Sequence, residues 1–267
     1  MTMITSLQNP LLKRIKRLRQ KKYRQAEGCF FAEGLRTVLT AVEQGAPLDT
    51  VVYAPELLTS PVGLAAVSRL QAEGVPVIAL STAAFAAISE RENPVGLGAI
   101  IGARLLRLEE LPRPVRAVYL ALVDVGDPGN LGTIVRTADA AGAAGVVLIG
   151  QTVDPFHSTA VKASMGAIFT VPLAHIPDIE PLSAWAAAHT ITTIATSARA
   201  TANYWEVAYP RPLLLLMGSE GEGLSAAVLA RADLQAAIPM RGTVSSLNLA
   251  VATGLMLYEI LRQAVRV

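Results

Sequence analysis

The sequence has a single cysteine, only three histidines and no hydrophobic run long enough to span a membrane. Cys29 has no partner for an internal disulfide, and its position in the apolar run 29–31 favours a core residue over a nucleophile. His157, His175 and His189 lack the spacing of metal ligands, so no metal is expected. A membrane span needs about 18 apolar residues, and the basic start contains no apolar signal core. We therefore expect a soluble, cytoplasmic protein that makes no membrane contact.

Charged residues are also scarce, at 16% of the chain, but basic charge is concentrated near the start. Residues 1–40 contain nine lysines and arginines against two glutamates, whereas the whole chain has a net charge of +2. Most of this charge falls on a helix that Asn9 and Pro10 are expected to open. A charge run is usually a solvated helix face, but this one lacks acidic partners four residues away, and unrelieved like charge is destabilising unless a polyanion neutralises it. We expect phosphate contacts with a nucleic acid from Lys13, Arg14, Lys16, Arg17, Lys21, Lys22 and Arg24.

The first hundred residues alternate between strand and helix patterns and predict a small α/β domain of their own. Gly34 and Arg36 stand at a strand-to-helix turn, where Arg36 could grip a phosphate or could equally pair with Glu33. Prolines and charges replace the alternation at 107–116, so we expect a linker there between domains at 1–106 and 117–267. The expected strands are 29–33, 50–53, 75–80 and 97–101, and the expected helices are 34–44, 62–73 and 82–89.

The second half repeats the alternation and predicts a mostly parallel sheet with helices on both faces. The expected strands are 118–124, 146–149, 170–173, 191–196, 213–217 and 234–238. The expected helices are 131–143, 158–166, 182–189 and 224–230, followed by an apolar helix near the end of the chain.

Two loops of this half have the composition of a ligand site. Residues 217–223 place three glycines after a fully apolar strand, which lets a ligand approach the backbone closely. Glu220 and Glu222 stand where a phosphate loop would have a lysine, so a neutral or cationic ligand is expected. The second loop, at 238–248, precedes the apolar helix, for which Ser245 or Ser246 is the expected N-cap. On this stretch alone, a capped core helix with a flexible entry is an equal alternative.

A third feature is the helix expected to start near residue 131. Asn130 stands at its start, and Arg136 is its only cation among small and apolar neighbours. An exposed helix residue is the simpler interpretation of Arg136, but this isolation favours a role at the ligand loops.

Three segments, 130–138, 218–223 and 238–248, resemble in order the three signature motifs of the SpoU/TrmH family of RNA ribose 2′-O-methyltransferases, in the SPOUT class. The basic helix and the turn at Gly34 resemble the small RNA-binding domain that many members carry. The resemblance implies a deep trefoil knot in the second domain, S-adenosylmethionine as cofactor and a homodimer built on the final helix. It favours ribosomal RNA as substrate. Transfer RNA, or an RNA-binding assembly factor without catalysis, remains the alternative.

The resemblance also implies roles for individual residues. Arg136 would stabilise the charge that develops on the ribose 2′-oxygen, Ser246 and Asn248 would position the ribose, and Asn130 and Glu220 would shape the loop and help to hold the substrate. The cofactor would lie against Met217, Gly218, Ile238, Met240, Ser246 and Leu247. A nucleotide-binding regulator of the doubly wound type is disfavoured, because the loop at 126–129 lacks the strict G-x-G-x-x-G pattern.

Overall fold

The computed structural model describes residues 3–265, and the chain divides into two compact units. Unit 1 extends to Arg104 and includes the later segment Phe156–Phe169. Unit 2 comprises Leu105–Pro155 and the chain from Thr170 onward. Within residues 3–265, no helix has the length and apolar character that crossing a membrane requires.

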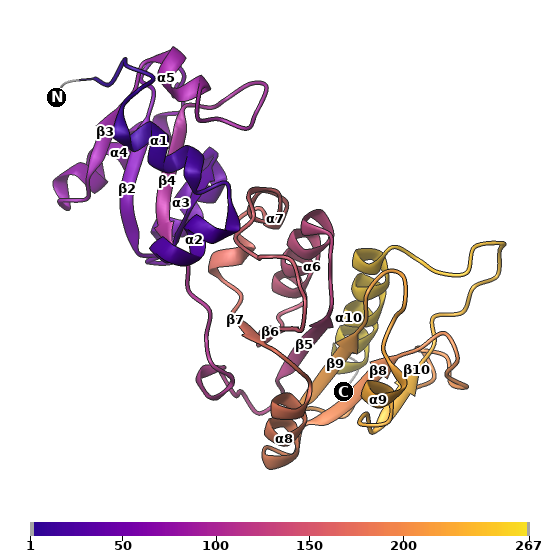
Figure 1. The fold of residues 1–267 in the computed structure, drawn as a ribbon. Helices are drawn as coiled ribbons and strands as arrows, with labels where there is room; N and C mark the ends of the chain where they lie inside the picture. The colour runs from indigo at the N-terminus through magenta and orange to yellow at the C-terminus, as the bar shows by residue number, and fades with distance from the viewer. Residues whose placement is uncertain (1–2, 266–267) are drawn as a thin grey trace. The chain divides into compact units, whose positions relative to one another are not determined.

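Unit 1 is built on a four-stranded mixed sheet in the order β1-β4-β2-β3 (Figure 1). β4 pairs antiparallel with both β1 and β2, whereas β2 and β3 are parallel. Cys29 is buried in its core, as predicted, and this burial raises the pKa of the thiol. The elements are β1 (Cys29–Glu33), α3 (Leu35–Glu43), β2 (Leu48–Tyr53), α4 (Pro61–Ala72), β3 (Val77–Ala79), α5 (Thr82–Ala86) and β4 (Leu97–Gly102).

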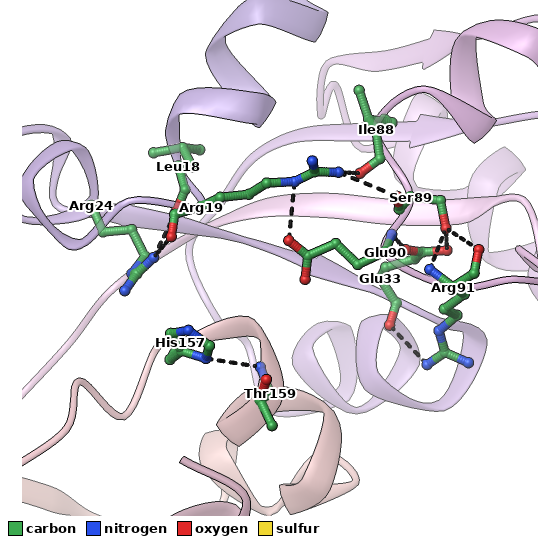
Figure 2. A network of polar contacts seen from close by, with 10 residues as sticks. All are labelled: Leu18, Arg19, Arg24, Glu33, Ile88, Ser89, Glu90, Arg91, His157 and Thr159. Atoms are coloured by element: carbon green, nitrogen blue, oxygen red, sulfur yellow. Dashed lines mark hydrogen bonds and ion pairs between the residues drawn. The ribbon is translucent and has the colours of Figure 1, made fainter. Parts of the chain in front are cut away.

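The basic segment forms two short helices rather than the single helix expected. α1 (Pro10–Arg17) is capped by Asn9, whose side chain accepts a hydrogen bond from the backbone N–H of Leu11. α2 (Lys21–Glu27) follows after a three-residue break. The guanidinium of Arg24 is buried and donates to the backbone carbonyls of Leu18 and Arg19 at 2.9 and 2.7 Å, as Figure 2 shows. These two carbonyls therefore accept hydrogen bonds from a side chain. In a continuous helix they would accept from backbone N–H groups.

The segment 156–169 packs with unit 1, although the sequence places it inside the second domain. It contains α7 (Ser158–Ser164) and a 3-10 turn, η2 (Ala167–Phe169). The ring of Phe30 on β1 stacks on Phe156 at 4.8 Å and on Phe169 at 6.1 Å between centroids. The aromatic contacts therefore fix this segment to the first sheet.

Replacing Phe30 with alanine is expected to destabilise unit 1 by about 3–5 kcal/mol, because the ring is 1% exposed and its loss leaves a cavity beside two other rings. Urea unfolding of the full chain, followed by fluorescence and circular dichroism, measures the effect. Phe30→Leu is the control, since it keeps most of the apolar volume and is expected to cost less. An unchanged unfolding midpoint in Phe30→Ala would show that the stacked rings contribute little.

Unit 2 contains a six-stranded sheet in the order β10-β8-β9-β5-β6-β7, and every pairing in it is parallel, as predicted. Tyr119 and Ala121 of β5 belong to a buried cluster with Trp185 of α8 on one face. α6 and α10 lie side by side and cover the other face (Figure 1). The elements are β5 (Val118–Val123), α6 (Pro128–Ala140), β6 (Gly145–Ile149), β7 (Leu173–Ile176), α8 (Glu180–Ala188), β8 (Thr192–Thr196), β9 (Leu213–Met217), α9 (Ala226–Leu229), β10 (Leu234–Ala236) and α10 (Leu249–Val265).

Three boundaries in unit 2 differ from the predicted ones in ways that affect the site. α6 begins at Pro128, so Asn130 lies inside its first turn, and Asp127 is the N-cap. The strand expected at 170–173 is β7, which starts only at Leu173. Asn248 caps α10 by accepting from the backbone N–H groups of Ala250 and Val251, so the prediction of Ser245 or Ser246 as N-cap was wrong.

Candidate active site

The loops that leave β5, β8, β9 and β10 meet at one edge of the parallel sheet. Parallel strands direct their carboxyl ends to the same edge, and ligands of open α/β sheets bind there. β9 lies between β5 and β8, with β10 outermost. The sheet therefore brings together the loops at 218–223 and 237–248, which contain two of the signature segments, and the loop at 124–127, which leads into α6 and the third segment at 130–138.

The loop after β9 folds back on itself at Gly218. The backbone N–H of Gly223 donates to the carbonyl of Ser219 at 3.1 Å, and the two residues form an isolated bridge. A Cβ at Gly218 would lie 2.1 Å from the carbonyl carbon of Gly223, so no side chain fits there. The glycine at 218 is thus required by a close approach of two backbone segments.

A chain of side-chain hydrogen bonds joins the three loops. The Nδ2 of Asn248 donates to the Oδ1 of Asn130 at 2.9 Å, and the Nδ2 of Asn130 donates to the Oε1 of Glu220 at 2.5 Å. The backbone N–H of Asn130 also donates to the carboxylate of Asp127 at 2.6 Å. Because Asn248 caps α10 as well, this chain ties the start of α6, the glycine loop and the start of α10 to one another.

The glycine loop, the loop before α10 and the segment after β8 line an open cavity of about 480 Å³. All six residues predicted to contact the cofactor line it, and so does Glu220. Its walls combine apolar side chains with the backbone of the glycine loop. Among residues 3–265, no group of three or more His, Cys, Asp or Glu side chains is placed to hold a metal ion. The predicted site residues that line the cavity are Met217, Gly218, Glu220, Ile238, Met240, Ser246 and Leu247.

Arg136, Asn130 and Asn248 lie outside the lining of the cavity. The two asparagines reach it through Glu220, whereas Arg136 is exposed on α6. Within the part of the chain that the structure describes, no side chain pairs with the Arg136 guanidinium. Its charge is therefore free to interact with a bound molecule.

The segment after β8 is part of the cavity, and the sequence interpretation missed it. The cavity lining includes Thr196, Ser197, Ala198 and Arg199, and Arg199 is the one cation on it. The hydroxyl of Thr196 donates to the carbonyl of Leu216 at 3.3 Å, which fixes this wall to β9. A small, polar run at the carboxyl end of a parallel strand was the available signal.

In unit 1, two of the arginines expected to contact nucleic acid are used within the protein. Arg24 is 4% exposed and donates hydrogen bonds to backbone carbonyls. Arg14 is paired with Glu27 and, through two nitrogens, with Asp49. The hydrogen bonds from Arg14 lower the pKa of the Asp49 carboxyl group. The residues that remain exposed for contact are Lys13, Lys16, Arg17, Lys21, Lys22 and Arg36.

The turn at Gly34 is also held from within unit 1. The carboxylate of Glu33 accepts from the hydroxyl of Ser89 and the backbone N–H of Glu90, at 2.7 and 3.2 Å (Figure 2). Glu33 therefore does not pair with Arg36, and Arg36 projects freely from α3. Of the two interpretations that the sequence left open for Arg36, contact with a bound anion is favoured.

Comparison with known proteins assigns a family to both parts of the chain. The SpoU rRNA Methylase family model matches residues 117–258, and the MRM3-like substrate binding domain matches residues 9–99. A protein of Synechocystis sp. named as an uncharacterized tRNA/rRNA methyltransferase is 36% identical, over 97% of this chain and 93% of the relative. The 23S rRNA guanosine 2′-O-methyltransferase RlmP of Bacillus subtilis is 31% identical, over 97% and 99% of the two chains.

The fold agrees with these similarities. The crystal structure of an AdoMet-bound rRNA methyltransferase from Sinorhizobium meliloti superposes with a TM-score of 0.90 at 38% identity, covering 98% of both chains. The family model matches more than half of the chain, and its span contains the cavity and the three joined loops. The chain belongs to the SpoU rRNA methylase family.

Proposed function

We propose that this protein transfers the methyl group of S-adenosylmethionine to a ribose 2′-hydroxyl of ribosomal RNA. The observation that carries the proposal is the cavity itself, where the six residues that we predict to contact the cofactor meet beside the hydrogen-bonded chain from Glu220 to Asn248. Relatives named as 23S rRNA 2′-O-methyltransferases support ribosomal RNA over transfer RNA as the substrate. A cytoplasmic location is part of the same proposal.

The residues present fit S-adenosylmethionine. A volume of about 480 Å³ lies within the range of small-ligand sites. Glu220 and Glu222 place negative charge where a cationic sulfonium is expected, and Gly218 leaves the backbone open to close approach. Ile238, Met240 and Leu247 supply apolar contacts for the adenosine. When bound, the cofactor supplies an electrophilic methyl group.

The protein must then orient a ribose and stabilise charge on its 2′-oxygen. The 2′-hydroxyl would lose its proton as its oxygen takes up the methyl group that the cofactor would supply, and the cofactor would leave as S-adenosylhomocysteine. Because a free 2′-hydroxyl is a very weak acid, positive charge aimed at this oxygen lowers the barrier. We assign that charge to Arg136 and the positioning of the ribose to Ser246 and Asn248. Arg136 lies off the cavity lining, so bound RNA or a partner chain must bring the reacting groups together.

We also propose a homodimer and a trefoil knot for unit 2. Val251, Leu255 and Tyr258 recur at helical spacing on α10 and are 52%, 38% and 52% exposed. Their apolar face would be buried by the same face of a second copy. The knot would follow from threading the segment around 238–248 through a preceding loop, as in the family. Unit 1 is the proposed RNA-binding domain, with the catalytic domain in unit 2.

Incubation with methyl-labelled S-adenosylmethionine and either purified ribosomal RNA or transfer RNA tests the proposal. Label is expected in ribosomal RNA that lacks the modification. Label only in transfer RNA would change the substrate. Bound RNA and bound cofactor without any incorporation would favour a non-catalytic assembly factor.

Replacing Lys16, Lys21 and Lys22 with glutamine is expected to weaken RNA binding and flatten its salt dependence. Each lost phosphate contact removes about 0.9 from the slope of log K against log salt on a duplex. Filter binding over a range of salt concentrations measures the slope. The control replaces Arg69, Arg107 and Arg231, which are paired with carboxylates in the protein. Equal slopes in the two variants would show that the basic helices are only a solvated face.

A further inference from the structure

Unit 1 contains a second cavity, separate from the cofactor site. It has a volume of about 180 Å³ and lies between the end of α1, strand β1, the segment after α5 and helix α7. Its apolar lining comes from Leu18, Phe31, Ile88, Phe156 and Val161. Phe31 is half-buried, whereas Phe156 is buried and its ring stacks on Phe30. An accessible aromatic ring on the wall of an open cavity is a surface on which unstacked nucleobases bind in proteins that recognise single-stranded RNA.

The rim of this cavity carries cations with unused donors, and both of its carboxylates already have hydrogen-bond or ion-pair partners, which Figure 2 shows. Glu33 accepts from Ser89 and Glu90, and Glu90 is itself paired with the Nε of Arg19 at 3.0 Å. Arg19 also donates through Nη2 to two backbone carbonyls, which leaves its Nη1 free.

Two further cations complete the rim. Arg91 donates through Nη2 to the carbonyl of Glu33 at 3.3 Å, and its remaining N–H groups are available to bind a ligand. Lys162 on α7 is exposed, and no partner for its ammonium lies within residues 3–265. The three cations of the lining exceed its two carboxylates, Glu33 and Glu90, by one positive charge, and this excess favours an anion such as a phosphate.

The cavity continues the basic surface of α1 and α2. Leu18 and Arg19 line it and follow directly on the last residue of α1, Arg17. Arg17 and Lys22 both lie over the ring of Tyr23, at 5.8 and 4.8 Å from its centroid. An RNA strand whose phosphates follow these helices therefore arrives at the mouth of the cavity.

We propose that this cavity receives one unstacked nucleotide of the substrate RNA. The base lies against the ring of Phe31, and the adjoining phosphate contacts Lys162 and the free donors of Arg19 and Arg91. The hydroxyls of Ser158 and Thr159 on the rim can hydrogen-bond the edge of the base. The inference rests on the proposed function only in taking RNA as the substrate. It adds that unit 1 recognises an unpaired nucleotide and not only a phosphate backbone.

The test measures binding of two probes by fluorescence anisotropy, without S-adenosylmethionine. One is a short single-stranded oligouridylate, and the other is an abasic ribose-phosphate chain of the same length. We expect the natural protein to favour the oligouridylate by about fivefold or more, the low end for one stacked base. Thr159→Trp fills the mouth of the cavity and should bring this preference close to one. Ser68→Trp, at an exposed position on α4 outside the cavity, is the matched control and should keep it.

Lys162→Gln provides an independent variant should the tryptophan disturb folding, which thermal unfolding detects. It is expected to weaken the binding of both probes by the same factor. It should also reduce the slope of log K against log salt by about 0.7, the value for one phosphate contact on a single strand. A base preference in Thr159→Trp equal to that of Ser68→Trp would overturn the proposal, as would an unchanged slope in Lys162→Gln. Failure of methyl transfer would count against the proposed function and leave these binding results intact.

Discussion

Replacing Arg136 with alanine is expected to lower the rate of methyl transfer by about 100-fold or more, while the chain still folds and binds S-adenosylmethionine. Arg136 is exposed on α6 and lies outside the cofactor cavity, so its removal disturbs neither the core nor the cavity wall. Arg136 is the one cationic residue of α6, and Asn130 lies in the first turn of the same helix. A loss confined to the chemical step is what removal of a preorganised charge produces.

Single-turnover methylation and calorimetric titration of the cofactor, made on the same preparation, separate the outcomes. Arg136→Lys keeps a positive charge and is expected to retain part of the rate, because an ammonium lacks the planar donor geometry of arginine. Arg116→Ala, which removes an exposed arginine of the linker region, is the matched control. Near-normal turnover in Arg136→Ala would remove the catalytic assignment. A loss of cofactor binding would make Arg136 a structural residue.

Gly218→Ala is expected to weaken cofactor binding by about fivefold to 100-fold, and methyl transfer should fall with it. The added Cβ would meet the carbonyl carbon and oxygen of Gly223 and the backbone nitrogen of Leu224 at 2.1, 2.4 and 2.5 Å. These are backbone atoms, so the loop must shift, and overpacking of this kind costs about 1–3 kcal/mol. The shift would move the cavity wall and the hydrogen bond from Asn130 to Glu220.

Gly221 is the matched control in the same loop. A Cβ there meets nothing within 4 Å, and its backbone conformation suits any residue. Gly221→Ala should bind the cofactor as the natural protein does. Equal affinities in the two variants would show that the loop does not form the cofactor site.

The sequence predicted the loops of the site because the chemistry there is local. Three glycines between Met217 and Leu224, and a polar run before an apolar helix, signal close backbone approach whatever the surrounding fold. Periodicity likewise identified the strand and helix order in both units. What joins the loops is not local: Asn130 and Asn248 are far apart along the chain, and only the parallel sheet brings them to 2.9 Å.

Two features that the sequence did not indicate, the burial of Arg24 and the packing of 156–169, depend on tertiary contacts. Nothing in the basic run distinguishes Arg24, whose guanidinium is buried, from Lys22, which is exposed. The charge pattern predicts exposure as if the helix were isolated. In the folded chain, the guanidinium of Arg24 instead donates hydrogen bonds to the backbone carbonyls of Leu18 and Arg19. The packing of 156–169 with unit 1 depends in the same way on the ring of Phe30, more than a hundred residues earlier.

The most direct measurement of the central claim is the chemical position of the transferred methyl group. Ribosomal RNA labelled by the protein from methyl-labelled S-adenosylmethionine is hydrolysed in alkali, and the products are separated by chain length. Alkaline cleavage needs a free 2′-hydroxyl, so ribose methylation protects the adjoining linkage. The account predicts that the label appears in alkali-stable dinucleotides. Label recovered in mononucleotides would show methylation of a base and would contradict it.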